Sequence, residues 1–283
     1  MGASISSKEQ PVVLITGCSE GGIGNCLARA FANQNCIVIA TSRSLSSMRD
    51  LQGEDQDKFF LQELDVVNEE SINKVVNFAI EKFGKIDILV NNAGIHCVGP
   101  LVEIPLSSIE NTFNTNVYGP MRMVQAVVPH MIPRRKGKIV NVGSVAALAP
   151  GPWAGAYSAT KCAIHSLSDT LRIELRVFGI SVTTVVPGAV KSNFGNASET
   201  RYNRLPEWKF YKAFADAIRS RTTLSQGPKS TPGEELAKNT VAAVLKKNPP
   251  AWFSYGRLSF VSAILYHLPL CIRDFILRMA MKA

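Results

Sequence analysis

Short apolar runs alternate along this chain with longer segments in which apolar residues recur at helical spacing. The apolar runs predict β-strands at 12–16, 36–41, 59–64, 86–91, 138–142 and 181–186. Helical periodicity predicts helices over 23–33, 69–83, 107–131 and 158–177. Because strands alternate with helices of crossover length, the pattern predicts an α/β fold: a Rossmann-type doubly wound parallel sheet with helices on both faces.

The pattern weakens after Pro187-Gly188. Residues 189–231 are polar, with a helix-like piece over 207–220. A long insertion of this kind is typical of a substrate-binding lid. Beyond it the pattern predicts a helix over 233–247 and a last strand over 252–255. We expect a single Rossmann-type domain over 1–283, with a flexible N-terminus at 1–10, the lid at 189–231 and an apolar helical tail at 257–283.

The apolar tail is too short to span a membrane. Fifteen residues between Arg257 and Arg273 carry no charge, whereas a spanning helix needs roughly 20 predominantly apolar residues. Pro269 also interrupts the stretch, so we expect two short helices with apolar faces. These faces either dock on a membrane surface, where Arg278 and its neighbours meet anionic headgroups, or cover the domain's own core or a partner copy.

Composition indicates a globular chain. It has 283 residues, of which 46% are hydrophobic and 19% charged, which argues against disorder. The formal net charge of +9 is compatible with nucleic acid, an anionic membrane or an anionic small molecule. The densest basic cluster, 134–138, favours a solvated loop, and no aromatic residues are interleaved with it as in single-stranded nucleic-acid sites. We expect no nucleic-acid partner.

The six cysteines form no C-x-x-C pair, and no histidine spacing completes a zinc site, so we expect no metal. They are interpreted as small buried apolar residues in a reducing compartment. The polar first ten residues contain no signal peptide. This predicts a cytoplasmic protein, with peripheral contact to an intracellular membrane or lipid droplet through the tail. Gly2 and Ser6 match a myristoylation pattern, but the pattern is short, and a flexible polar tail is the favoured interpretation.

A glycine-rich segment, TGCSEGGIG, follows the first expected strand and opens a helix. Glycines allow a tight turn and close approach of the backbone to a pyrophosphate, and the helix N-terminus supplies free N–H groups and positive potential. The expected phosphate contacts are Gly17, Ser19, Gly22, Ile23 and Gly24.

The end of the second strand lies in the segment ATSR, where Ser42 and Arg43 follow the expected strand 36–41. Sites specific for NAD place an acid here to bind the ribose 2′-hydroxyl. No acid is present, and Arg43 is available to pair with a 2′-phosphate. The sequence therefore favours NADPH (NADP+) as cofactor.

The segment NNAG follows the fourth strand, at the carboxyl end where ligands of parallel sheets bind. We expect Asn92, Ala93 and Gly94 to approach the cofactor. Taken alone, an ordinary turn explains the segment equally well.

Ser144, Tyr157 and Lys161 carry the expected chemistry. Tyrosine and lysine four residues apart share one helix face. An ammonium group beside a phenol favours the phenolate, so we expect Lys161 to lower the pKa of Tyr157 from about 10 and make it an acid/base near neutral pH. Ser144 is placed to hydrogen-bond the substrate oxygen.

With these motifs the chain resembles the short-chain dehydrogenases/reductases from about residue 12 to residue 254. The resemblance implies a catalytic set of Asn116, Ser144, Tyr157 and Lys161, in which Asn116 holds a water of a proton relay. It also implies further cofactor contacts at Asp65, Val66, Tyr157, Lys161, Pro187, Gly188, Val190 and Ser192.

Two features depart from the family pattern. The glycine turn has one additional residue, so either Gly21 or Gly22 takes the place of its middle glycine. Many NADPH-dependent members carry a basic residue before that glycine, where this chain has Glu20. The NADPH preference therefore rests on Ser42 and Arg43.

Within the family, TGCSxGGIG and the apolar tail after a Tyr-Gly pair are similar to fungal-type 1-acyldihydroxyacetone-phosphate reductases and related hydroxysteroid dehydrogenases. This resemblance implies an NADPH-dependent carbonyl reductase or alcohol dehydrogenase for a bulky hydrophobic lipid, steroid-like or secondary-metabolite substrate, and a homo-oligomer. The alternative is a non-catalytic NADPH-binding sensor of the same fold. The presence of both Tyr157 and Lys161 favours the enzyme.

Overall fold

The computed structural model describes residues 10–281, and its centre is a seven-stranded parallel sheet in the order β3-β2-β1-β4-β5-β6-β9. This confirms the Rossmann-type α/β fold. The strand order reverses between β1 and β4, and such a switch point is where open parallel sheets bind ligands. The strands are β1 (Val12–Thr16), β2 (Ile37–Ser42), β3 (Phe59–Glu63), β4 (Ile88–Asn91), β5 (Gly137–Val142), β6 (Ile180–Pro187) and β9 (Trp252–Tyr255).

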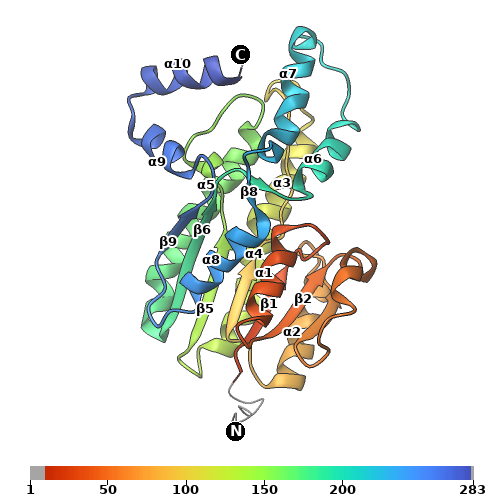
Figure 1. Cartoon of the computed structure of the whole chain (residues 1–283), viewed down its shortest axis with the longest axis vertical. Helices are drawn as coiled ribbons and strands as arrows, with labels where there is room; N and C mark the ends of the chain where they lie inside the picture. The colour runs from red at the N-terminus through yellow and green to blue at the C-terminus, as the bar shows by residue number, and fades with distance from the viewer. Residues whose placement is uncertain (1–9, 282–283) are drawn as a thin grey trace.

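Helices cover both faces of the sheet (Figure 1). On one face, Phe31 and Val241 belong to one buried apolar cluster with the strands. On the other face, Val75, Met123 and Leu171 belong to a second cluster. The covering helices are α1 (Ile23–Ala32) and α8 (Gly233–Val244) on the first face, and α2 (Glu69–Phe83), α4 (Gly119–Met131) and α5 (Gly155–Glu174) on the second.

The long helix expected over 107–131 is built from three pieces. These are α3 (Leu106–Phe113), the π-helical turn η2 (Asn114–Tyr118) and α4. A π-helical turn inside a helix is rare and is found frequently at functional sites. Here it carries Asn116, one of the expected catalytic residues.

The region expected to be the lid differs from the prediction. The helix expected over 207–220 is only partly helical, whereas α6 was not predicted and lies earlier in the region. The buried residues of α6 are Gly195 and Ser198, so it lacks the apolar stripe that reveals a helix in a sequence. The pieces are β7 (Val190–Lys191), α6 (Phe194–Tyr202), η5 (Lys212–Phe214), α7 (Ala215–Ser220), η6 (Arg221–Gln226) and β8 (Thr231–Pro232).

The tail forms the two short helices that were predicted, α9 (Ser259–His267) and α10 (Leu270–Met281), on either side of Pro269. Figure 1 shows them extending beyond β9, away from the layers of sheet and helices. Of their described side chains, only Ser262 and Leu265 are buried. No helix within residues 10–281 is long and apolar enough to cross a membrane.

Two interpretations of the sequence are corrected by the structure. Cys162 and Cys271 are exposed and Cys26 is only partly buried, so the expectation that all cysteines are buried is wrong for these three. The basic cluster 134–138 is not simply solvated, because Arg134 forms an ion pair with Asp87 and Lys138 lies in β5. The myristoylation pattern lies outside the described residues.

Candidate active site

The turn between β1 and α1 is shaped by glycines. Gly17 has a φ of +75°, and a Cβ at this position would lie 2.8 Å from the Cα of Ala93. A Cβ on Gly24 would lie 2.5 Å from Nδ2 of Asn92 and closer still to the carbonyl of Gly17. Larger residues would therefore fill the space at the N-terminus of α1, whose free N–H groups suit a pyrophosphate.

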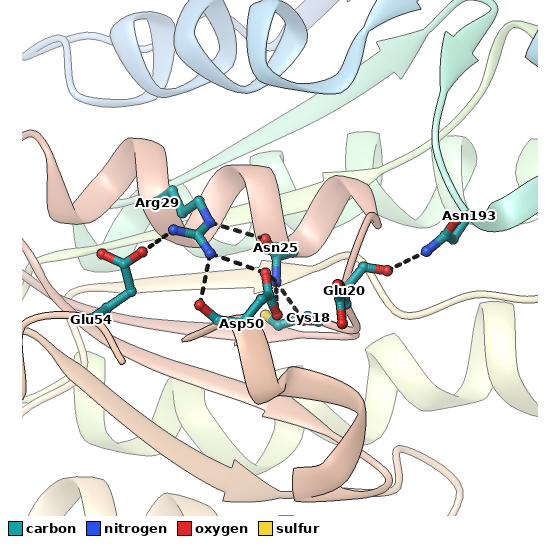
Figure 2. A network of polar contacts seen from close by, with 7 residues as sticks. All are labelled: Cys18, Glu20, Asn25, Arg29, Asp50, Glu54 and Asn193. Carbon is teal, nitrogen blue, oxygen red and sulfur yellow. Dashed lines mark hydrogen bonds and ion pairs between the residues drawn. The ribbon is translucent and has the colours of Figure 1, made fainter. Parts of the chain in front are cut away.

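The two candidates for the middle glycine have different surroundings. Gly22 is the cap residue of α1, directly before Ile23. Gly21 has a φ of +66°, and a Cβ there would lie 2.8 Å from Cγ of Asn193, on the lid. Asn193 donates a hydrogen bond of 2.6 Å to the carbonyl of Glu20 (Figure 2). The segment that carries Asn193 thus rests on the turn at residues 20 and 21, whereas Gly22 caps the start of α1.

Hydroxyl groups gather where β1 and β2 end. Oγ of Ser42 lies 2.9 Å from Oγ of Ser19 and 2.7 Å from Oγ of Ser47. Ser47 was missed by the sequence analysis because it lies in η1 (Leu45–Leu51), a 3-10 segment with no motif. Arg43 is adjacent, and within residues 10–281 its side chain forms no hydrogen bond or ion pair. This combination of hydroxyls and a free guanidinium fits a 2′-phosphate.

Arg29 provides a contrast to Arg43 in the same part of the structure. It pairs with Asp50 at 3.0 Å and with Glu54, and Asp50 also accepts a hydrogen bond from Asn25 (Figure 2). These contacts hold η1 against α1, and so they fix the position of Ser47. Arg29 is neutralised by acids, whereas Arg43 is left available for a ligand.

The NNAG segment is bound to the glycine turn. Nδ2 of Asn92 donates to the carbonyls of Thr16 and Gly17, both at 2.9 Å. The N–H groups of Asn92 and Ala93 both donate to Oγ1 of Thr16 at 3.0 Å. A Cβ on Gly94 would lie 3.3 Å from Oδ1 of Asn116, so Gly94 joins this segment to the expected catalytic residues.

Asn116 is buried and fully engaged. Its Nδ2 donates to the carbonyl of Ile95 at 2.9 Å and to Oγ1 of Thr160 at 3.1 Å. Its Oδ1 accepts a hydrogen bond of 2.8 Å from the N–H of Ile95. The π-helical turn that carries Asn116 is therefore tied both to the NNAG loop and to α5.

Tyr157 and Lys161 lie one turn apart at the start of α5. Nζ of Lys161 donates a hydrogen bond of 2.8 Å to the carbonyl of Val142 and lies 5.6 Å from the centre of the Tyr157 ring. The side chain of Ser144 lies beside that of Tyr157, where it acts to lower the pKa of the tyrosine, and its Oγ accepts a hydrogen bond of 3.1 Å from the N–H of Ala146. The structure brings the expected catalytic residues together.

The predicted effect of Lys161 on Tyr157 is wrong. Burial raises the pKa of Tyr157 to about 12, although the side chain of Ser144 and the charge of Arg221 act in the opposite direction. Burial also lowers the pKa of Lys161 to about 8. The free energy that it costs to remove the phenolate from water is larger than the stabilisation that Ser144 and Arg221 provide. Tyr157 therefore holds its proton at neutral pH, as a proton donor must.

Two aromatic contacts of Tyr157 were missed by the sequence analysis. The rings of His96 and Tyr157 pack edge to face at 4.6 Å, and the ring of Phe194 lies 5.9 Å from that of Tyr157. Nδ1 of His96 lies 2.9 Å from Oγ of Ser198. Burial lowers the pKa of His96 to about 3, so this imidazole is neutral. No motif marks these residues, because their proximity depends on where α6 packs.

The remaining expected cofactor residues lie at or near the ends of their strands. Asp65 and Val66 follow β3, and Oδ1 of Asp65 accepts a hydrogen bond from the N–H of Val67. Pro187 ends β6, and the N–H of Gly188 donates to the carbonyl of Tyr255 at 2.9 Å. The last two, Val190 and Ser192, lie in β7 and directly after it.

Comparisons with known proteins agree with this geometry. Residues 11–203 match the profile of the short chain dehydrogenase family. The short-chain dehydrogenase fogD of Aspergillus ruber is 36% identical over 255 residues, which cover 87% of this chain and 84% of that protein. The NADPH-dependent 1-acyldihydroxyacetone phosphate reductase of Schizosaccharomyces pombe is 41% identical over 184 residues, covering 64% and 60%.

Solved structures have the same fold. A short-chain dehydrogenase from Streptomyces avermitilis matches with a TM-score of 0.79 at 30% identity, covering 90% of this chain and 91% of that one. The closed form of serine dehydrogenase complexed with NADP+ matches with a TM-score of 0.74 at 28% identity, covering 88% and 95%.

The chain belongs to the short-chain dehydrogenase family and is an oxidoreductase. Enzymes of this family typically use NAD(P) and act on small molecules. The family match extends over the glycine turn, the NNAG segment and the Ser144, Tyr157 and Lys161 cluster.

Proposed function

We propose that this chain is an NADPH-dependent oxidoreductase that reduces a bulky hydrophobic ketone to an alcohol, or catalyses the reverse reaction. The observation that carries the proposal is the cluster of Asn116, Ser144, Tyr157 and Lys161 beside Gly94, at the carboxyl end of the sheet.

Each residue of this cluster has a separate role in carbonyl reduction. A nicotinamide bound at this site would supply the hydride that adds to the carbonyl carbon. Tyr157, which keeps its proton at neutral pH, donates it to the carbonyl oxygen, and Ser144 orients that oxygen. Lys161 provides positive charge as the phenol loses its proton. Asn116 holds the turn of α5 that carries both residues and supports the relay that returns the proton.

Three features support NADPH rather than NADH. No acid directly follows β2, the guanidinium of Arg43 has no partner within the described chain, and the hydroxyls of Ser19, Ser42 and Ser47 lie close to one another at the end of the same strand. The Schizosaccharomyces pombe relative is named as NADPH-dependent. The residues proposed to hold the cofactor are those expected from the sequence, from Gly17 to Ser192.

A hydrophobic substrate is supported by the surroundings of Tyr157. The ring of Phe194 lies 5.9 Å from that of Tyr157, and the ring of His96 packs edge to face on the same tyrosine at 4.6 Å. Oxidation of NADPH with a panel of acyl-ketone, steroid and polyketide carbonyls tests the proposal. Reduction of small polar ketones alone, or equal rates with NADH, would contradict it.

We further propose that α9 and α10 dock on the surface of an intracellular membrane, facing the cytoplasm. Phe260, Phe275 and Met279 are 77%, 65% and 68% exposed, so these faces do not cover the domain's own core. Arg278 is exposed on the same tail, which suits anionic headgroups.

The test of membrane docking is truncation after Leu258, because Arg257 pairs with Ala189 and must be kept. Flotation with vesicles containing phosphatidylserine should occur for the full chain and fall sharply for the truncated one. Vesicles of phosphatidylcholine alone should bind more weakly. A dimer that is lost on truncation, without vesicle binding by the full chain, would assign the tail to a second copy instead.

A further inference from the structure

A cavity of about 570 Å³ lies between the end of β2 and the lid helix α6. Its lining includes three arginines, Arg43, Arg201 and Arg204, and no aspartate or glutamate. Two of these arginines come from α6 and the turn after it, and the third comes from the end of β2. The cavity therefore has a strongly cationic wall built from two distant parts of the chain.

The positive charges of this wall are not neutralised by the protein. Within residues 10–281 the three side chains form no ion pair and no hydrogen bond. The acid nearest in sequence on α6, Glu199, is paired with Arg219 at 2.8 Å. Burial and the charges of Arg43 and Arg204 lower the pKa of Arg201. Grouped guanidinium groups without an acid are the arrangement that binds phosphates and carboxylates.

Helix α6 connects this wall to the catalytic tyrosine. At its start, the ring of Phe194 lies 5.9 Å from that of Tyr157. One turn later, Ser198 contacts His96, which packs on the same tyrosine. Arg201 follows three residues after Ser198. An anion held by Arg201 would therefore also hold the helix against Tyr157.

We propose that Arg201 and Arg204 bind the 2′-phosphate of NADPH together with Arg43, and that this contact holds α6 closed over Tyr157. The inference rests on the proposed dependence on NADPH. A 2′-phosphate carries up to two negative charges and three acceptor oxygens, which several guanidinium groups can share. NADH lacks this group, so it would leave α6 less firmly held. A phosphate or carboxylate on the substrate has the same chemistry, and the experiment must separate the two sources.

The first measurement is binding affinity. NADPH, NADH, adenosine 2′,5′-bisphosphate and 5′-AMP are titrated into the wild type and the double variant Arg201→Ala/Arg204→Ala. We expect affinity for NADPH and for the bisphosphate to fall at least about tenfold, since hydrogen bonds to charged groups are lost. Affinity for NADH and 5′-AMP should change less than about twofold.

A matched control removes a positive charge elsewhere. Arg176 is exposed on η4 (Leu175–Phe178), at the opposite end of α5 from Tyr157. Arg176→Ala should leave all four affinities unchanged. If the double alanine variant does not fold, as judged by thermal unfolding, Arg201→Gln/Arg204→Gln keeps the length of the side chains and removes only their charge.

The second measurement is hydrogen exchange over residues 194–202. NADPH should slow exchange in α6 more than NADH does in the wild type, and this difference should disappear in the double variant. If NADPH and NADH slow hydrogen exchange in α6 equally in the wild type, the 2′-phosphate does not hold α6 closed, and the inference is overturned.

The outcomes separate this inference from the proposed function. A wild type with no preference for NADPH over NADH contradicts the proposed cofactor. A preference that survives in the double variant overturns only the role of Arg201 and Arg204. If the bisphosphate binds normally to the double variant but inorganic phosphate no longer competes with the ketone, the anion belongs to the substrate, which also overturns the inference.

Discussion

Nδ2 of Asn116 donates a hydrogen bond of 3.1 Å to Oγ1 of Thr160. The hydroxyl of Thr160 in turn donates to the carbonyl of Tyr157 at 2.7 Å. Thr160, which directly precedes Lys161, therefore links the π-helical turn to the backbone of the catalytic tyrosine. We infer that Thr160 positions Tyr157 without touching the substrate.

Replacing Thr160 by valine tests this positioning role. Thr160→Val keeps the shape of the side chain, removes its hydroxyl and leaves the amide of Asn116 with one bond fewer. We expect kcat to fall about tenfold, as for a lost buried hydrogen bond of about 1–2 kcal/mol, with little change in KM for NADPH. Thr160→Ser keeps the hydroxyl and should restore most of the rate. Equal kcat values for the valine variant and the wild type would show that the link is only structural.

Removing the hydroxyl of Tyr157 tests the proton donor. Tyr157→Phe keeps the ring and its contacts with His96 and Phe194, so cofactor binding should stay nearly normal. Turnover should fall at least about 10²-fold, the scale of a positioned acid. The control is Tyr118→Phe, because Tyr118 is 56% exposed on η2 and outside the cluster. Turnover close to that of the wild type in Tyr157→Phe would refute the mechanism.

Removing the charge of Arg43 tests the cofactor preference. Arg43→Ala should raise KM for NADPH about tenfold, because a charge-assisted bond to the 2′-phosphate is lost, and should barely change KM for NADH. Arg49→Ala is the control, since Arg49 is exposed on the adjacent segment η1. Parallel changes for both cofactors would make Arg43 a structural residue.

Gly24→Ala tests the close packing of the glycine turn. The added Cβ would lie 2.5 Å from Nδ2 of Asn92, so the turn must shift. We expect a loss of about 1–3 kcal/mol in the free energy of unfolding and weaker binding of both cofactors. A Cβ on Gly53 would meet nothing within 4 Å, so Gly53→Ala should be neutral in urea unfolding. Similar unfolding curves for the two variants would contradict the predicted contact.

Lys161→Met tests the cost of the buried ammonium. Burial lowers the pKa of Lys161 from 10.5 to about 8, and this shift corresponds to a loss of about 3 kcal/mol in the free energy of unfolding of the wild type. The variant also loses the hydrogen bond from Lys161 to the carbonyl of Val142, which offsets about 1 kcal/mol of the gain. At pH 7 the inactive variant should therefore be more stable by about 2 kcal/mol.

This gain should depend on pH. Between pH 8 and 10.5 the unfolded lysine keeps its proton while the folded one has lost it, so the stability of the wild type rises with pH in this window. The gain from Lys161→Met should shrink over the same range. Urea unfolding at several pH values measures it, and a gain that is constant up to pH 10.5 would contradict the buried charge as its source.

The elements that the sequence predicted best are those with strong local signals. The bounds of β1 and α2 agree with the prediction, because β1 is wholly buried and α2 has an Asn68 cap and a left-handed Gly84 at its end. Helix α6 was missed because its buried residues are small, not large and apolar. The sequence pattern predicts a helix or strand only when the buried positions of that element are occupied by apolar residues.

The same distinction applies to the site. Ser144, Tyr157 and Lys161 follow from motif spacing along one segment. Phe194 and Arg201 are near the site only because α6 folds back over it, and no spacing marks them. The pKa of Tyr157 was predicted in the wrong direction because the degree of burial is a property of the packed structure.

The packing of α8 against α1 has a consequence for synthesis of the protein. Leu27 and Phe31 share one buried cluster with Ala237 and Val241, about 200 residues later in the chain. At about 5–20 residues per second, a ribosome needs about 10–40 seconds to translate that interval. The nascent chain must keep this apolar side of α1 and the sheet from aggregating until α8 emerges. The segment 11–203, which carries every family motif, is therefore not expected to be soluble when expressed alone.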